Sequence, residues 1–125
     1  MPLSTEHERA KFAYDKVIEN YQSKAESEKQ KFESWAEKLP SMIVSCGLLQ
    51  AVAFYGTKRE GEPFCKIINE WVKARLQLGD DNFDTLEWLT HSVDNLQQYL
   101  YISDEVLKLS IWVKKMAKAL KGKQL

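Results

Sequence analysis

Two histidines and two cysteines are the side chains in this chain best suited to a zinc site or a Cys–His nucleophile. His7 falls in the first turn of an expected helix and His91 near a helix boundary, while Cys46 and Cys65 lie in apolar stretches. None of the four has the spacing that protein zinc sites use. A Cys–His nucleophile would need the fold alone to bring the pair together. We therefore expect no catalytic residue, no metal site, no cofactor and no small-molecule substrate.

The thiols also bear on the compartment in which the protein works. The sequence begins Met-Pro-Leu-Ser and passes straight into charged residues, so no signal peptide is visible. We therefore expect a cytoplasmic protein, and the cytoplasm keeps protein thiols reduced. We therefore expect Cys46 and Cys65 to be buried and free rather than joined in a disulfide.

Basic side chains near the C-terminus have the pattern of a surface that binds a polyanion. The last expected helix begins with Ser103 as its N-cap and ends at Gly122, and no acidic residue follows Glu105. Ammonium groups along a helix can neutralise a nucleic-acid backbone without reading bases. The alternative is a solvated face that only keeps the protein soluble. The lysines on this face are Lys108, Lys114, Lys115, Lys118 and Lys121.

Two further groups of basic residues are candidates for the same surface. Lys58 and Arg59 lie in an expected loop, although Glu60 and Glu62 beside them weaken the positive charge. The third group, Arg9, Lys11 and Lys16, is expected on the outer side of the first helix. The formal net charge is zero, with 18 basic and 18 acidic residues, so any nucleic-acid contact must be local.

Tryptophans are candidates for stacking on nucleic-acid bases, but most fall on apolar stripes of expected helices. We therefore expect Trp35, Trp71 and Trp88 in the core rather than on the surface. Trp112 lies at the border of an apolar stripe, where it serves either the core or a partner.

The elements that must position these residues are all expected to be helices. Three prolines, five glycines and apolar residues at helical spacing predict an all-α bundle of five to seven helices, forming one domain over residues 1–125. The uncharged stretch from Pro40 to Tyr55 is apolar on every side, which predicts a central buried helix beginning at Pro40 and ending at Gly56. It is too short to span a bilayer, and we expect no membrane contact.

The segments around this stretch carry recognisable helix ends. The first helix is expected to open at Ser4 or Thr5, and to run on to Leu39 or break near Ser23; its register favours continuity. Pro40 is expected to end it in either case. Further helices are expected from Pro63 to about Leu78–Gly79 and, capped by Asp84, through Leu89.

Two segments resemble one family, the small subunit of the type III-B CRISPR-associated Cmr complex. Residues 39–55 resemble its pattern LP-x-x-I-x-x-x-GL-x-x-x-x-AF, although Cys46 stands where a polar residue is expected. The polar stretch from Ser23 to Gln30 is also longer than the family's. The C-terminal segment resembles the family's cap followed by L-x-x-x-x-W-L-K-x-x-A. The matching residues there are Tyr101, Ser103, Glu105, Leu107, Trp112, Lys114, Lys115 and Ala117.

The resemblance implies a non-enzymatic helical subunit of an RNA-guided antiviral complex. Copies of such a subunit stack as a minor filament beside the backbone subunits, and their basic surfaces line the channel that holds the target RNA. The implied partners are other Cmr subunits, copies of the chain itself and the guide–target RNA duplex. The residues expected to contact the RNA backbone are Lys58, Arg59, Lys114, Lys115, Lys118 and Lys121.

Two alternatives remain open at this stage. One is a helical protein–protein adaptor with no nucleic-acid role, which would use an apolar patch around Trp112 or Tyr99–Tyr101. The other is the small subunit of a related type III complex, with much the same mechanism.

Overall fold

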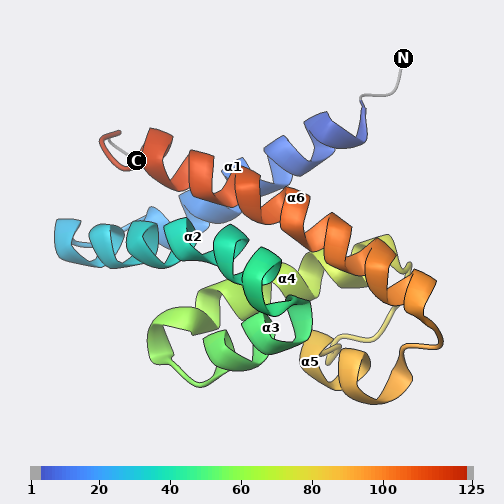
Figure 1. Ribbon diagram of the computed structural model, residues 1–125. Helices are drawn as coiled ribbons and strands as arrows, with labels where there is room; N and C mark the ends of the chain where they lie inside the picture. Colours follow the sequence, from blue (N-terminus) through green and yellow to red (C-terminus); the bar gives the residue numbers. More distant parts are fainter. Residues whose placement is uncertain (1–3, 124–125) are drawn as a thin grey trace.

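The computed structural model describes residues 4–123, which form six α helices and no strand, and it confirms the all-α prediction (Figure 1). Residues 1–3, on which the judgement about a signal peptide rests, lie outside this range. A short 3-10 turn, η1 (Arg59–Gly61), precedes α4, and one π-helical turn, η2 (Trp88–Ser92), follows α5. The α helices are α1 (Thr5–Tyr21), α2 (Glu26–Cys46), α3 (Leu48–Gly56), α4 (Glu62–Arg75), α5 (Thr85–Glu87) and α6 (Leu96–Leu120).

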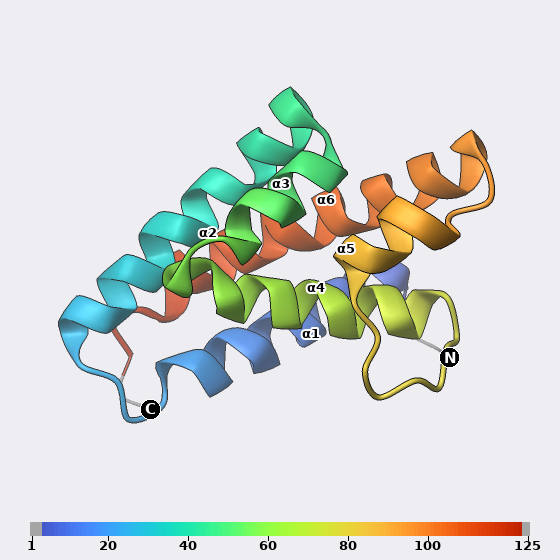
Figure 2. The same ribbon diagram turned by 90° about the horizontal axis from the view of Figure 1, so that it is seen from below.

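The longest helix, α6, takes the central place that the sequence suggested for the segment 40–55. Both α1 and α2 pack along it, and α4 contacts it from below in the view of Figure 1. In Figure 2, which is seen from below, α4 lies in front of α6, between α1 and α3. The buried residues of α6 recur every three or four positions, from Ile102 to Leu120, as an amphipathic helix requires. The Tyr21 hydroxyl donates a 2.7 Å hydrogen bond to the Ala117 carbonyl and ties α1 to the end of α6.

Pro40 does not end a helix, contrary to the sequence-based expectation. It lies inside α2, buried, and the helix continues to Cys46. A proline in a helix interior removes one hydrogen bond at a cost of about 3 kcal/mol. Its neighbours Leu39 and Ile43 are buried in the same contact surface, and their burial offsets that cost. The expectation of a helix buried on every side is also wrong, because Val44 is 70% exposed and Cys46 is exposed.

The break that the sequence placed at Pro40 lies instead at Gly47. This residue has φ 87° and ψ 159°, a conformation open essentially to glycine alone, and it separates α2 from α3. The 3.4 Å hydrogen bond that the Leu49 N–H donates to the Tyr99 hydroxyl joins the corner to the start of α6. The corner therefore turns α3 across the end of α2, and this hydrogen bond links it to the start of α6.

We expect Gly47→Ala to lower the free energy of unfolding by about 1–3 kcal/mol, because a Cβ forces this backbone into strain. Space is not the cause, since the nearest atom to such a Cβ, the Tyr99 hydroxyl oxygen, lies 3.5 Å away. Urea denaturation followed by circular dichroism measures the change. Gly79→Ala is the control, because a Cβ there meets nothing within 4 Å. Equal stability of the two variants would contradict the prediction.

Other helix ends correct or refine the sequence reading. The first segment is broken, because Ser23 with φ 61° ends α1 before α2 begins. Ser4 is the N-cap of α1, and its Oγ accepts a hydrogen bond from the His7 N–H. Asp84 caps α5 as expected. The sequence predicts that α6 starts at Ser103, but the helix begins earlier, at Leu96. The Asn95 side chain caps it by accepting a 2.8 Å hydrogen bond from the Gln98 N–H.

Candidate nucleic-acid interface

The lysines of α6 lie along its outer surface but differ in how far their charge is already neutralised. Lys108 Nζ lies 2.8 Å from Asp104 one turn earlier on the same helix. Lys115 lies 5.5 Å from the centre of the Trp112 ring, in cation–π geometry. Lys115 and Lys118 are exposed and form no ion pair within residues 4–123. The two are the freest cations of this helix.

Glutamates of α2 neutralise the other two lysines, which the sequence did not indicate. Lys114 Nζ lies 3.4 Å from Glu37 Oε1, and Lys121 Nζ lies 3.1 Å from Glu33 Oε1. The pairs form because α2 and α6 run antiparallel, so that residues 77 and 88 positions apart face each other. The lysine face of α6 carries only positive charge when this helix is considered alone. With α2 packed beside it, the surface carries both positive and negative charges. A helical period cannot reveal this pairing, because it depends on how two distant helices pack.

The loop cations Lys58 and Arg59 lie on the other side of α2. Both are exposed, and the turn η1 that holds them is closed by the 3.0 Å hydrogen bond from the Gly61 N–H to the Lys58 carbonyl. Arg59 lines a hollow of about 400 Å³ between η1 and the start of α2. Two lysines that the sequence reading did not single out, Lys24 and Lys31, line it too, together with Glu28 and Glu60.

Helix α2 therefore separates the two groups of predicted contact residues. In Figure 1 it runs between α6 above and the segment from α3 to α4 below. The exposed charged residues of α2 are Glu26, Glu28, Lys31, Glu37 and Lys38. The α6 lysines and the η1 cations thus flank one helix whose solvent-facing strip carries charges of both signs and four serines. The exposed serines of this strip are Ser27, Ser34, Ser41 and Ser45.

The third group of basic residues does not form an outer cationic face. Arg9 is 7% exposed and lies between α1 and α6, where its Nη2 donates a 2.6 Å hydrogen bond to Glu105 Oε2. This hydrogen bond and the charge of Glu105 raise the pKa of Arg9 further. Lys16 pairs with Glu70 of α4. Only Lys11 of this group is exposed, so the expectation fails for Arg9 and Lys16.

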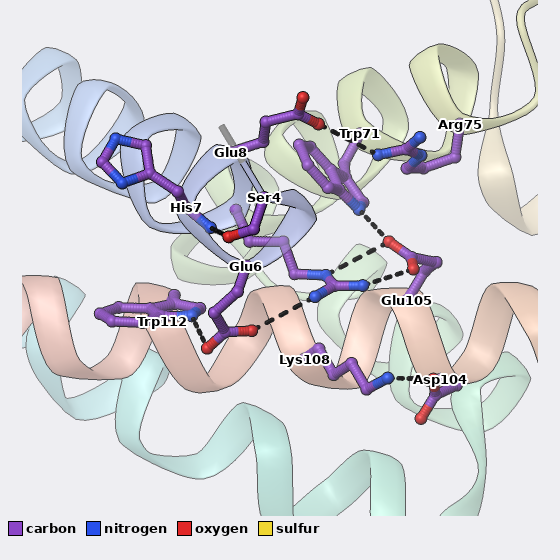
Figure 3. A network of polar contacts seen from close by, with 11 residues as sticks. Ser4, Glu6, His7, Glu8, Trp71, Arg75, Asp104, Glu105, Lys108 and Trp112 are labelled. Atoms are coloured by element: carbon purple, nitrogen blue, oxygen red, sulfur yellow. Dashed lines mark hydrogen bonds and ion pairs between the residues drawn. The ribbon is translucent and has the colours of Figure 1, made fainter. Parts of the chain in front are cut away.

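Arg9 is the centre of a polar network that joins three helices. Figure 3 labels the other members of the network, Glu6, Trp71, Glu105 and Trp112. The Trp71 Nε1–H of α4 donates to Glu105 Oε1 at 3.2 Å. Glu6 of α1 accepts from Arg9 at 3.3 Å and from Trp112 Nε1 at 2.8 Å. Each buried charge in the network therefore has a partner. The network is structural, because its guanidinium is fully engaged with carboxylates.

The remaining chemistry-bearing side chains are dispersed. Cys46 is exposed, which corrects the expected burial, and Cys65 is half-buried with a pKa raised by that burial. Both thiols are free. His7 and His91 are exposed. Among the described residues, no three His, Cys, Asp or Glu side chains gather as a metal site would require, and no helix is long and apolar enough to cross a membrane.

The tryptophans follow the sequence reading only in part. Trp71 is 5% exposed and belongs to the core. Trp35 and Trp88 are half-buried and pack against the core from its edge. Trp112 is half-buried, with its ring between α6 and the start of α1.

Comparison with known proteins gives a concordant result. The sequence pattern of the family described as CRISPR-associated protein (Cas_Cmr5) matches residues 5–120. A crystal structure of a CRISPR-associated Cmr5 family protein from Thermus thermophilus superimposes with a TM-score of 0.74 at 27% identity, covering 94% of this chain and 98% of that one. No curated protein matches the chain. The family match confirms the resemblance in the sequence: the chain belongs to the Cmr5 family of CRISPR-associated proteins, the small subunit of the type III-B Cmr complex.

Proposed function

We propose that this chain is a non-catalytic, single-domain subunit of a Cmr complex and that its basic surface contacts the backbone of the target RNA. The observation that carries the proposal is the placement of two cation groups on either side of α2. Four of these cations are exposed and form no ion pair in the described part of the chain: Lys58, Arg59, Lys115 and Lys118. Such cations attract phosphates without sequence preference.

The six predicted contact residues are not expected to contribute equally. Lys114 and Lys121 must exchange a glutamate for a phosphate when RNA arrives. The gain is then smaller than for an unpaired lysine, because one ion pair is lost as another forms. Lys115 and Lys118 lose no such partner, so we assign them the larger share of α6's contribution.

Copies of the chain are proposed to stack side by side as a minor filament along the complex. The formal net charge of zero supports this arrangement, because neighbouring copies do not repel one another strongly. Exposed apolar side chains at the start of α6 offer contact area to a neighbouring protein: Leu96 is 70%, Leu100 55% and Tyr101 47% exposed. The same residues would serve the alternative function, a helical adaptor without a role in RNA binding.

Reversing the charge of three α6 lysines in the assembled complex tests the RNA assignment. We expect Lys114→Glu, Lys115→Glu and Lys118→Glu together to lower target-RNA affinity. The slope of log affinity against log salt should also flatten by up to about 0.7 for each lost single-strand phosphate contact. Fluorescence polarisation with labelled target RNA at several salt concentrations measures both quantities.

A control variant should change the net charge equally without touching this surface. Lys11→Glu, Lys66→Glu and Lys73→Glu place the same three reversals on α1 and α4. An unchanged salt slope in the α6 variant, or an equal change in the control, would reject the assignment. The adaptor alternative predicts that neither variant alters RNA binding.

A further inference from the structure

Two aromatic rings, Trp35 of α2 and Phe54 near the end of α3, form a partly exposed stack between these helices. The rings of Trp35 and Phe54 are nearly parallel, with 6.0 Å between centroids and 16° between planes. Trp35 is half-buried, whereas Phe54 is 42% exposed. Its sequence neighbour Tyr55, in contrast, is 0% exposed. The pair therefore presents an aromatic surface to solvent.

The buried side chain behind this pair fixes its position. The Tyr55 ring is 0% exposed and meets Trp35 edge-to-face at 5.0 Å. Its hydroxyl donates a 2.6 Å hydrogen bond to the Trp35 carbonyl, which ties α3 to α2 at this point. Tyr55 also packs edge-to-face on Phe64, whose side chain is buried. The exposed rings thus rest on a rigid support and need no rearrangement to receive a flat ligand.

Four cations lie close to the two rings along the chain, and none of them has a carboxylate partner among residues 4–123. Lys38 Nζ lies 5.3 Å from the centre of the Trp35 ring. Lys31 lies one helical turn before Trp35, and Lys58 follows Phe54 by four residues. Lys31 and Arg59 line the same 400 Å³ hollow. The unpaired cations are Lys31, Lys38, Lys58 and Arg59.

Three carboxylates of α2 are engaged elsewhere, which leaves these cations free. Glu28 pairs with Lys24 at 3.9 Å, and Glu33 and Glu37 pair with lysines of α6. Glu60 and Glu62, beside Lys58 and Arg59, form no ion pair in the described part of the chain. Positive charge therefore exceeds negative charge around the rings.

We propose that Trp35 and Phe54 form a stacking platform for one unpaired base of a single-stranded RNA. The base lies on the exposed Phe54 ring, and the flanking phosphates lie toward Lys31 and Lys58. Stacked aromatics inside a positive groove are how proteins bind single strands without reading sequence. The inference rests on the proposed function, because it assumes RNA reaches this side of α2, and it adds a base contact to the backbone contacts.

The charge distribution favours RNA over a protein partner here. An aromatic patch with Lys38 against one ring, and with more unpaired cations than unpaired carboxylates nearby along the chain, fits a ligand that has both flat apolar surfaces and regular negative charge. A nucleotide has both. A protein partner at this site is the competing outcome of the test.

Two substitutions at Phe54 test whether binding needs the aromatic ring itself or only an apolar side chain. Phe54→Leu keeps an apolar side chain but removes the ring, and Phe54→Tyr keeps the ring. In the assembled complex we expect Phe54→Leu to weaken binding of the matched target RNA about fivefold, with the salt slope unchanged. Phe54→Tyr should bind within about twofold of the parent chain, since the stacking surface remains. Tyr14→Leu, which removes another exposed aromatic ring on α1, is the matched control.

Ultraviolet cross-linking of the parent complex gives a readout that does not depend on any variant. Irradiation at a wavelength absorbed by the bases, followed by mass spectrometry, should attach an RNA base to a peptide containing Phe54 or Trp35. The absence of such a cross-link, together with unchanged affinity of Phe54→Leu, would overturn the platform. The lysine reversals of α6 would still decide the backbone contacts on their own.

The protein-partner outcome has a distinct signature. In that case Phe54→Leu lowers the number of copies of this chain in the purified complex, measured by native mass spectrometry. RNA affinity then falls only in proportion to the number of copies lost, and no base cross-link appears at the rings. Phe54→Tyr either loses the same number of copies or keeps them all. That result would reject base stacking.

Discussion

Arg9→Met is expected to destabilise the protein by about 3–5 kcal/mol, because it leaves Glu105 as a buried charge without its cationic partner. Both side chains of the pair are 8% exposed, so water cannot replace the lost guanidinium. The Trp71 Nε1–H is a single neutral donor and does not compensate for the charge. The loss is measured as a lower midpoint in urea denaturation followed by circular dichroism.

Removing both partners should cost much less than removing one. In Arg9→Met with Glu105→Leu, no buried charge remains, and buried ion pairs replaced by apolar residues are often neutral in stability. An exposed pair provides the matched control: Lys108→Met breaks the 2.8 Å contact with Asp104 on the surface of α6 and should cost no more than about 0.5 kcal/mol. Equal losses for Arg9→Met and Lys108→Met would show that burial of the Arg9–Glu105 pair has no energetic effect.

Gly61→Ala is expected to destabilise the protein by about 3 kcal/mol, for a steric reason. A Cβ at Gly61 would lie 2.1 Å from the Tyr55 carbonyl oxygen and 2.8 Å from the Tyr55 carbonyl carbon. These are backbone atoms of a buried residue, so they cannot rotate away as the end of a long side chain would. Either η1 or the end of α3 must move. Thermal and urea denaturation measure the loss.

The displacement should also reach the proposed RNA surface, because Lys58 is the N-cap of η1 and Arg59 its first residue. We expect Gly61→Ala to weaken RNA binding in the complex even at temperatures where the protein stays folded. Gly56→Ala is the control, since a Cβ there meets nothing within 4 Å. A Gly61→Ala variant as stable as Gly56→Ala would contradict the expected clash.

The helical period of apolar residues was sufficient to predict the fold class and most of the core. It located the buried faces of α4 and α6, where Ile67, Trp71 and Val113 lie as expected. It failed at Pro40, because a rule about local backbone preference does not count the apolar surface buried on both sides of the proline. Gly47 was instead expected to be an interior helix residue, since its positive φ leaves no trace in the hydrophobic pattern.

The candidate site was harder to predict than the fold, for a physical reason. Which lysines are free depends on which carboxylates reach them from other helices, and Glu33 and Glu37 reach α6 only through antiparallel packing. Arg9 looked like a surface residue because it is charged, yet Glu105 makes its burial possible. The exposure of Phe54 was missed because it lies in a run of apolar residues that the sequence placed wholly inside.

The ion pairs between α2 and α6 give this protein an anion of its own at two of its six predicted RNA contacts. Glu33 and Glu37 form ion pairs with Lys121 and Lys114 in the structure, and so compete with RNA phosphates for these lysines. A phosphate must displace them, so a short or mispositioned strand gains little at these two sites. Under the proposed function, such self-competition would keep the affinity of a lone subunit low and would reserve tight binding for RNA that many neighbouring copies hold at once.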